Sequence, residues 1–207
     1  DKMVAIIDYG AGNLHSVKNA LDYLGASCEI TGDADKISSA DRVILPGVGA
    51  FGDCMKSLEN AGLVDTVIAA AKSGKPFLGI CLGLQLMFEE SEEAPGIRGL
   101  GIFKGKVVKI PDAPQLKIPH MGWNNTETVK ESKILSGNPY VYFVHSYYIE
   151  PDDKNIISAY TEYGKKIAVA VEDGNVFATQ FHPEKSGQAG LEILKRFIAL
   201  GGENNVR

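Results

Sequence analysis

The sequence predicts an α/β fold, with an open, mainly parallel twisted sheet flanked by helices and antiparallel strands in the second half. The first 90 or so residues alternate short apolar runs with stretches whose apolar residues recur at helical spacing, as in βαβ units. Beyond about residue 100, strand-like runs follow one another directly. The chain has 207 residues, 44% hydrophobic and 23% charged, so we expect one folded domain over 1–207 and exclude wholesale disorder.

In the first half, short runs that are mostly apolar or strand-like predict strands at 3–8, 27–31, 42–45 and 77–80. Helices are expected between or after them at 14–24, 51–61, 63–73 and 82 to about 90. Glycine-rich turns at 10–12 and 46–49 connect strands to the elements that follow.

In the second half, strands are expected at 101–110, 123–129, 140–144, 156–160, 167–172 and 176–180. Asp173-Gly174 is a good hairpin turn between the last two. A final helix is expected over 187–200, with an apolar stripe, and 201–207 is expected to be a frayed polar tail.

Composition excludes several classes of function. A net charge of −5 argues against a general nucleic-acid binder, and no run approaches the length of a membrane span. Three cysteines without CxxC spacing and four scattered histidines predict neither a disulfide framework nor a metal site, and they suit the reducing cytoplasm. The dinucleotide motif GxGxxG is incomplete, because His15 stands where its third glycine belongs, so we expect no cofactor.

Cys81 lies in Gly79-Ile80-Cys81-Leu82-Gly83, where a buried strand is expected to meet a helix. This is the arrangement of a nucleophile elbow, in which glycines permit a sharp turn that exposes the nucleophile. The helix N-terminus behind it favours a thiolate, and the Leu82 amide points toward developing negative charge. The alternative is a buried cysteine in an apolar run, the reading we give to Cys28 and Cys54.

His182 and Glu184 are the best candidates for a base and its partner. They are two residues apart in Gln180-Phe181-His182-Pro183-Glu184, just after a strand, and in extended backbone they point the same way. A carboxylate there can fix the imidazole tautomer and stabilise its protonated form. The alternative is a surface histidine beside a surface glutamate.

Pro46-Gly47-Val48-Gly49 follows the third strand, so it is expected at the same sheet edge as Cys81. A backbone N–H of this loop can stabilise an oxyanion, and the glycines on both sides of Val48 ease rotation of the Val48–Gly49 peptide. We expect the free chain to turn the Val48 carbonyl toward the substrate, which would break the oxyanion hole. The alternative is a fixed turn whose glycines serve packing alone.

Six segments together resemble the class I, triad-type glutamine amidotransferases, over residues 4 to 198. They are IIDYGAGNLHSV, LPGVGAFGD, PFLGICLGLQLMFEESEE, IPHMGWN, YFVHSYY and ATQFHPEKSG. The cysteine elbow and the HPE segment mark the class. The DYGAGN, HMGWN and VHSYY segments narrow the resemblance to the glutaminase subunits of imidazole glycerol phosphate synthases, of histidine biosynthesis. The implied fold is flavodoxin-like.

The resemblance implies that the thiol of Cys81 attacks the side-chain amide of glutamine, that His182 moves the proton and that Glu184 orients the imidazole. It further implies glutamate and ammonia as products, through a thioester. The remaining implied roles are an oxyanion hole and glutamine contacts, which fall on the amides of Gly49 and Leu82, the side chain of Gln85, and the backbone of Ser146 and Tyr147.

The resemblance also implies a partner. In the family, a (β/α)₈-barrel synthase subunit, a cyclase, receives the ammonia through an internal tunnel and forms imidazole glycerol phosphate and an aminoimidazole carboxamide ribonucleotide. This chain has no barrel, so a heterodimer is expected, with Asn13 and Lys185 as candidate partner contacts. Open alternatives are the glutaminase of anthranilate or pyridoxal phosphate synthesis, a stand-alone hydrolase, or a non-enzymatic module on the same fold.

Overall fold

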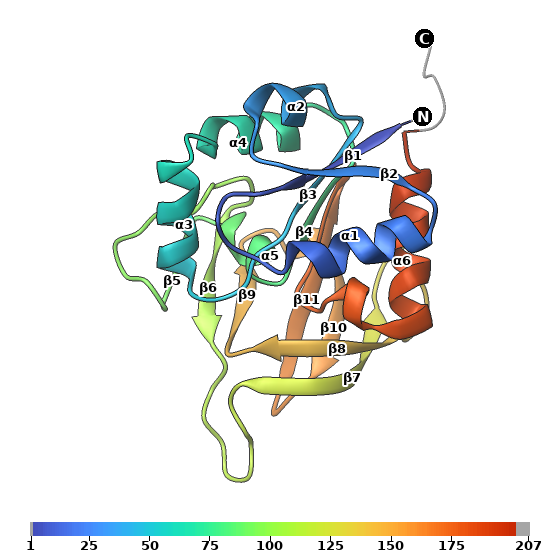
Figure 1. Cartoon of the computed structure of the whole chain (residues 1–207). Helices are drawn as coiled ribbons and strands as arrows, with labels where there is room; N and C mark the ends of the chain where they lie inside the picture. Colours follow the sequence, from blue (N-terminus) through green and yellow to red (C-terminus); the bar gives the residue numbers. More distant parts are fainter. Residues whose placement is uncertain (1, 202–207) are drawn as a thin grey trace.

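A computed structural model, which describes residues 2–201, shows one twelve-stranded sheet with helices on both faces (Figure 1). The strands are β1 Met3–Ile7, β2 Ser27–Thr31, β3 Arg42–Leu45, β4 Phe77–Ile80, β5 Glu90–Ser91, β6 Gly105–Lys109, β7 His120–Thr128, β8 Tyr140–His145, β9 Tyr147–Pro151, β10 Ile157–Glu162, β11 Lys166–Asp173 and β12 Val176–Thr179. The helices are α1 Leu14–Tyr23, α2 Ala34–Ser39, α3 Phe51–Asn60, α4 Val64–Lys72, α5 Leu82–Leu86 and α6 Gly187–Ala199, with short 3₁₀ turns η1 Lys154–Ile156 and η2 Pro183–Lys185.

The main path of the sheet runs β2-β1-β3-β4-β12-β11-β10-β7-β8. From β2 to β12 all neighbours are parallel, and from β12 to β8 all are antiparallel, which confirms the predicted fold class. Strands β4 and β12 are paired so that Ile80 lies beside Thr179. This register places the residues that follow them, Cys81 and Gln180, next to each other at the carboxyl ends of these two strands.

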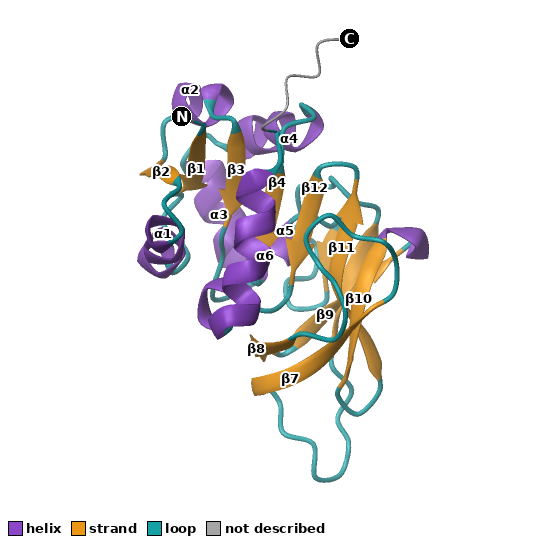
Figure 2. Ribbon diagram, turned by 90° about the vertical axis from the view of Figure 1, so that its right-hand side faces the viewer, coloured by secondary structure: helices purple, strands orange, loops and turns teal. Residues whose placement is uncertain are grey.

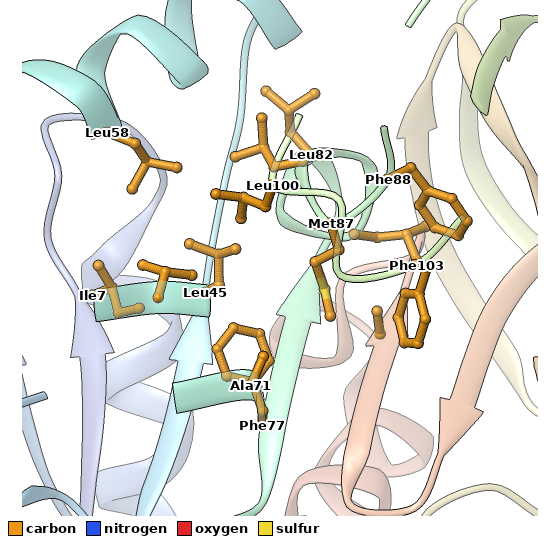
Figure 3. Close-up of a cluster of buried hydrophobic side chains, with 14 of the residues drawn as sticks. Ile7, Leu45, Leu58, Ala71, Phe77, Leu82, Met87, Phe88, Leu100 and Phe103 are labelled. Atoms are coloured by element: carbon orange, nitrogen blue, oxygen red, sulfur yellow. The ribbon is translucent and has the colours of Figure 1, made fainter. Parts of the chain in front are cut away.

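Two apolar cores lie on opposite faces of the parallel strands. On one face, Ile7, Leu45 and Phe77 from the strands pack with Leu58 of α3 and Met87 after α5 (Figure 3). On the other face, alternate strand residues pack against α1 and α6, and Figure 2 shows α6 lying along this side. Because both faces are covered, the central strands β1, β3, β4 and β12 are mainly apolar, which is why their boundaries were predicted to within one residue.

The antiparallel half departs from the parallel layer. Strands β7 and β8 form a pair that crosses below the ends of the central strands in Figure 1, with His120 opposite His145. Strands β6 and β9 pair with each other, and β9 also contacts β11. The C-terminal end of β8 and the start of β9 therefore lie over the edge where β4 ends, as the contacts of the site below show.

Several predicted boundaries were wrong. The helix after Cys81 ends at Leu86 instead of near residue 90, because the Leu86 carbonyl accepts a hydrogen bond from Leu100 N–H, at 2.8 Å, and Glu90 enters β5 beside β6. The strand predicted over 101–110 begins at Gly105. Elements α2, β5 and β9 were not predicted.

The predicted hairpin turn is present, but the two residues between the strands are Gly174 and Asn175. Helix α6 begins where it was predicted and ends one residue early. The predicted tail lies outside the described residues from 202 onward. No helix within residues 2–201 is long and apolar enough to cross a membrane.

Candidate active site

Cys81 occupies the sharp turn between β4 and α5. Its φ of 56° and ψ of −114° place an L residue in a region that such residues rarely adopt. The neighbouring glycines are sterically required: a Cβ at Gly83 would lie 2.0 Å from the Leu45 carbonyl oxygen, and one at Gly79 would lie 2.5 Å from the Met87 sulfur. The geometry is that of a nucleophile elbow.

His182 and Glu184 form a buried hydrogen-bonded pair, with 2.6 Å between His182 Nδ1 and Glu184 Oε1. The turn that carries them is fixed to β8, because His182 N–H donates to the Tyr142 carbonyl and Tyr142 N–H donates to Ser186 Oγ. Burial opposes protonation of His182, but the adjacent Cys81 and Glu184 outweigh it and raise its pKa to about 10. The imidazole is therefore protonated at neutral pH.

The thiol of Cys81 has two hydrogen-bonding neighbours. Its Sγ lies 3.8 Å from the Val144 carbonyl oxygen, which can only accept, and 3.8 Å from the amide nitrogen of Gln180, which can only donate. His182 Nε2 is buried without a hydrogen-bond partner among residues 2–201, and it is the ring nitrogen that Glu184 leaves free. The His182 ring thus lies near the thiol but is not hydrogen-bonded to it.

A pocket of about 250 Å³ opens beside Cys81. It is smaller than the roughly 300–1,000 Å³ of sites for drug-sized ligands, so it suits a small molecule. Its lining comprises Val48, Gly49, Cys81, Leu82, Gln85, Glu93, Pro119, Val144, His145, Ser146 and Tyr147. The structure thus brings together Cys81 and every residue predicted for the oxyanion hole and the glutamine contacts.

The predicted glutamine contacts are themselves held by hydrogen bonds. Gln85 Nε2 donates to the Tyr147 carbonyl at 3.2 Å and to Gln180 Oε1 at 3.1 Å, which leaves Gln85 Oε1 for a ligand. The Ser146 carbonyl accepts from Ile110 N–H at 2.9 Å. The backbone at 146–147 is therefore a fixed wall of the pocket.

Two histidines fix this wall from behind. Because the Tyr147 carbonyl can only accept, His145 Nδ1 carries a proton and donates to it, at 2.8 Å. His145 Nε2 then accepts from His120 Nδ1 at 2.9 Å, and His120 Nε2 faces the Asn124 amide at 3.3 Å. Burial lowers the pKa of His145 to about 3 and that of His120 to about 4, so both rings are neutral.

Side chains from two other elements hold the loop at 46–49. Tyr9 Oη donates to the Pro46 carbonyl at 2.7 Å, and Cys54 Sγ lies 3.4 Å from the Val48 carbonyl. The expectation that the Val48 carbonyl faces the substrate was wrong for this conformation, because Cys54 does not line the pocket and binds that carbonyl. In a planar trans peptide the Gly49 N–H points the opposite way. The Leu82 N–H, in contrast, is occupied by the Gly47 carbonyl at 3.1 Å.

Asn13 and Lys185 do not line the pocket. Asn13 is exposed and precedes α1, and Lys185 is half-buried in η2, which packs against α1. They lie on adjacent elements near the triad, and their role as partner contacts stays a prediction.

Sequence reasoning missed Glu93, Val144 and Gln180. Glu93 belongs to the acidic run after α5, which looks like a solvated charge run, yet it lines the pocket and accepts the Phe51 N–H at 2.7 Å. Val144 acts through its carbonyl, which no sequence pattern reveals. Gln180 is two residues before His182, and its place in the segment Gln180-Phe181-His182-Pro183-Glu184 was the available signal in the sequence.

The elbow, the His–Glu pair and the parallel sheet define a class of protein. The family model described as glutamine amidotransferase class-I matches residues 5–200, and the chain belongs to this family. It is 50% identical to the imidazole glycerol phosphate synthase subunit HisH of Methanothermobacter thermautotrophicus, over 96% of this chain and 98% of the relative. HisH of Methanocaldococcus jannaschii is 48% identical, over 96% of this chain and 100% of the relative. The family resemblance seen in the sequence is confirmed.

Solved structures agree on the fold. A crystal structure of a glutamine amidotransferase superposes with a TM-score of 0.76 at 21% identity, covering 97% of this chain and 99% of that one. The glutaminase domain of a Trypanosoma brucei CTPS with bound acivicin superposes with a TM-score of 0.65 at 19% identity, covering 96% and 94%.

Proposed function

We propose that the chain is the glutaminase subunit of an imidazole glycerol phosphate synthase, which hydrolyses L-glutamine to glutamate and ammonia. The observation that carries this proposal is the strained Cys81 beside the buried His182–Glu184 pair, at the mouth of a small pocket. The names of the relatives supply the pathway, since both are subunits of that synthase.

The chemistry follows from the geometry. The Cys81 thiolate attacks the amide carbon of glutamine, and the Gly49 N–H stabilises the resulting oxyanion. The C–N bond then breaks, His182 gives its proton to the leaving nitrogen, and ammonia departs from a thioester. Neutral His182 next takes a proton from water, whose oxygen attacks the thioester and releases glutamate and the thiolate.

The second oxyanion donor requires a change in the loop. Leu82 N–H donates to the Gly47 carbonyl, and it becomes available only if this carbonyl moves away. We infer that ligand or partner binding shifts the loop at 46–49 and frees this donor. One missing donor costs about 10²–10³ in rate, so the isolated chain is expected to be a poor glutaminase.

The pocket offers matching groups for the rest of the substrate. The Glu93 carboxylate can bind the α-ammonium group of the substrate glutamine. Gln85 Oε1 is free to accept a hydrogen bond from an N–H group of the same substrate. Because these contacts are remote from the scissile bond, they orient the amide over Cys81.

The partner is proposed to be a (β/α)₈-barrel cyclase subunit, which uses the ammonia before water protonates it. Its docking surface on this chain is an apolar patch of Met121, Trp123 and Tyr140 on β7 and β8, with exposed fractions of 62, 47 and 53%. The Trp123 ring stacks on Tyr140 and approaches Gly187, two residues beyond Lys185. The patch is thus continuous with that predicted contact. The three cysteines are free, which fits a complex in the reducing cytoplasm.

The decisive experiment uses Cys81→Ala in complex with the cyclase subunit. Synthesis from glutamine should vanish, whereas synthesis from added ammonium salt should persist, because the ring chemistry belongs to the partner. Wild-type chain with the partner gives both activities as the reference. Equal loss of both activities would assign Cys81 to folding or docking, and no glutamine-dependent activity in the wild-type complex would refute the proposal.

A further inference from the structure

We propose that Gln180 is a further catalytic residue, whose side-chain amide donates a hydrogen bond to the Cys81 thiolate. This inference rests on the proposed function, because it concerns the same nucleophile. Gln180 is fully buried, and its Nε2 lies 3.8 Å from Cys81 Sγ. The pairing of β12 with β4 puts the two residues side by side, so the contact is built into the sheet.

The direction of the Gln180 amide is fixed by its neighbours. The Tyr147 carbonyl can only accept, so the end of Gln85 that faces it is the NH₂ group. The second N–H of the Gln85 NH₂ group donates to the side chain of Gln180, at 3.1 Å, so Gln180 must present its oxygen, Oε1, to Gln85. The NH₂ end of Gln180 is therefore the one that points at Cys81.

The Tyr147 carbonyl, where this chain of hydrogen bonds begins, is itself held in place by further hydrogen bonds. The Tyr147 carbonyl also accepts from His145 Nδ1, and His145 is held by His120 across β7 and β8. The side chains of His120, His145, Gln85 and Gln180 are all buried, so their polar atoms stay paired in the chain of hydrogen bonds from β7 to the nucleophile. Reversing the Gln180 amide would set its oxygen against the thiolate and its NH₂ against another NH₂.

An amide N–H beside sulfur has a specific chemical consequence. It cannot accept the thiol proton, so it adds nothing to proton removal, which is left to His182. It stabilises the charged sulfur of the thiolate more strongly than the neutral sulfur of the thiol, which is only a weak acceptor. The thiolate exists twice in the cycle, before attack on glutamine and when the thioester breaks, so Gln180 assists both steps. The thiol form instead donates to the Val144 carbonyl.

The test measures the rate at which iodoacetamide alkylates Cys81 in the full chain, from pH 5 to 10, with peptide mapping to separate Cys28 and Cys54. Alkylation reports the thiolate. Gln180→Met keeps the length of the side chain and removes the donor, and Gln180→Asn withdraws the donor by one methylene. We expect a midpoint about one pH unit higher in both variants, and roughly tenfold slower alkylation at pH values below the wild-type midpoint, since one pH unit is a tenfold change in ionisation.

The matched control is Thr179→Val, one residue earlier on β12. Its hydroxyl is equally buried and donates to the Phe181 carbonyl at 2.9 Å, away from Cys81. This variant should lose stability without moving the midpoint. Wild-type midpoints in both Gln180 variants would overturn the inference, and the second variant serves if the first does not fold. Glutaminase assays of the wild-type complex test the proposed function separately, since alkylation needs no glutamine.

Discussion

Cys81 combines a strained backbone with a reactive side chain. A φ of 56° at a residue with a Cβ costs about 1–3 kcal/mol, and it persists only where the surroundings leave no alternative. Here the Cys81 N–H donates to the Thr179 carbonyl at 2.8 Å on one side, and the turn is wedged against the Leu45 carbonyl at Gly83 on the other. The strain thus holds Sγ at the mouth of the pocket.

The raised pKa of His182 predicts the alkaline limb of the pH profile. His182 is the acid that protonates the departing ammonia, and its pKa of about 10 keeps the imidazole protonated at neutral pH. This proton is lost only as the pH rises through about 10. Glu184→Gln removes one of the groups that raise this pKa, so the alkaline limb of kcat/KM should move to lower pH.

We also expect Glu184→Gln to lower kcat by roughly 10²–10⁴, less than Cys81→Ala, because an amide can still contact the ring but does not stabilise its charge. The measurement is the pH–rate profile of glutamine hydrolysis by the complex. Glu192→Gln, at an exposed position on α6, is the control. An unshifted alkaline limb in Glu184→Gln would show that the carboxylate does not set the His182 pKa.

At the scale of elements, the packing of the turn from β4 into α5 and helix propensity predict opposite effects on stability for alanine at Gly83. Alanine at Gly83 would favour a helix by about 1 kcal/mol, but its Cβ would lie 2.0 Å from a backbone oxygen that cannot move alone. The clash outweighs the propensity, so Gly83→Ala should destabilise the chain by roughly 1–3 kcal/mol and reduce Cys81 alkylation. Urea unfolding checks the first effect.

Gly62 provides the comparison. It has φ of 69° with open space around its Cβ position, so Gly62→Ala should cost only about 1–2 kcal/mol and leave Cys81 unaffected. A Gly83 variant as stable as the wild type, with normal alkylation, would contradict the structural role of that glycine.

Parallel strands and the nucleophile elbow could be predicted from sequence because they depend on local patterns. The central strands β1, β3 and β4 are mainly apolar on both faces, and the elbow is indicated by glycines on each side of a cysteine. Strand β9 could not be predicted, because it forms by pairing with β6, which is distant in the sequence. In this pair Val107 lies opposite Ile149, some 40 residues further along the chain. Helix α2 is six residues long with one buried side chain, Ile37, so it has no apolar period.

The site shows the same division. His182 and Glu184 were found because they are only two residues apart in the sequence, although Glu184 lies in the turn η2 and not in extended backbone as expected. The backbone of Tyr147 was implied only by the family resemblance. The use of Val144 depends on its carbonyl oxygen, and every residue has one, so only the fold can show that this one is used. The occupied Leu82 N–H is likewise a property of the loop conformation.

The loop at 46–49 yields a prediction for Cys54, on α3. Its thiol fixes the Val48 carbonyl at 3.4 Å and with it the direction of the Gly49 N–H. Burial raises the pKa of Cys54 to about 11, so the group stays a neutral donor. Cys54→Ala should lower kcat for glutamine, by up to the 10²–10³ that one oxyanion donor contributes, with little change in KM.

Cys54→Ser retains an O–H donor and should keep most of the activity. The readout is kcat and KM of the complex with glutamine, beside the ammonium-dependent reaction, which should be unchanged in both variants. Equal activity of the alanine and wild-type chains would mean that the loop holds its orientation without the thiol.

For the whole molecule, the two halves of the sheet divide the work. The parallel half presents Cys81 at the carboxyl ends of its strands, as doubly wound sheets do. The antiparallel half supplies the wall at 144–147 and extends β7 and β8 outward as an exposed apolar surface. The chain of hydrogen bonds from His120 to Gln85 spans the two, so a partner bound on β7 contacts the element that also positions the pocket.

Trp123 is the residue on which docking should depend most. Alternate residues of β7 are exposed, and Trp123 presents a large ring stacked on Tyr140 at 5.6 Å, which costs little entropy to bury. Trp123→Ala should weaken the complex with the cyclase by about 2 kcal/mol or more, roughly 30-fold in Kd. Titration calorimetry or analytical ultracentrifugation measures this directly.

The kinetic consequence distinguishes docking from folding. At subunit concentrations below the new Kd, Trp123→Ala should lose glutamine-dependent synthesis, because ammonia is released to water, while synthesis from ammonium salt continues. Raising the concentration of the cyclase should restore the coupled activity. Ile97→Ala removes a similarly exposed apolar side chain, 40% exposed, which packs near Gly52 on the α3 side, and should leave Kd unchanged. A Trp123 variant that binds the cyclase as tightly as the wild type would place the interface elsewhere on the chain.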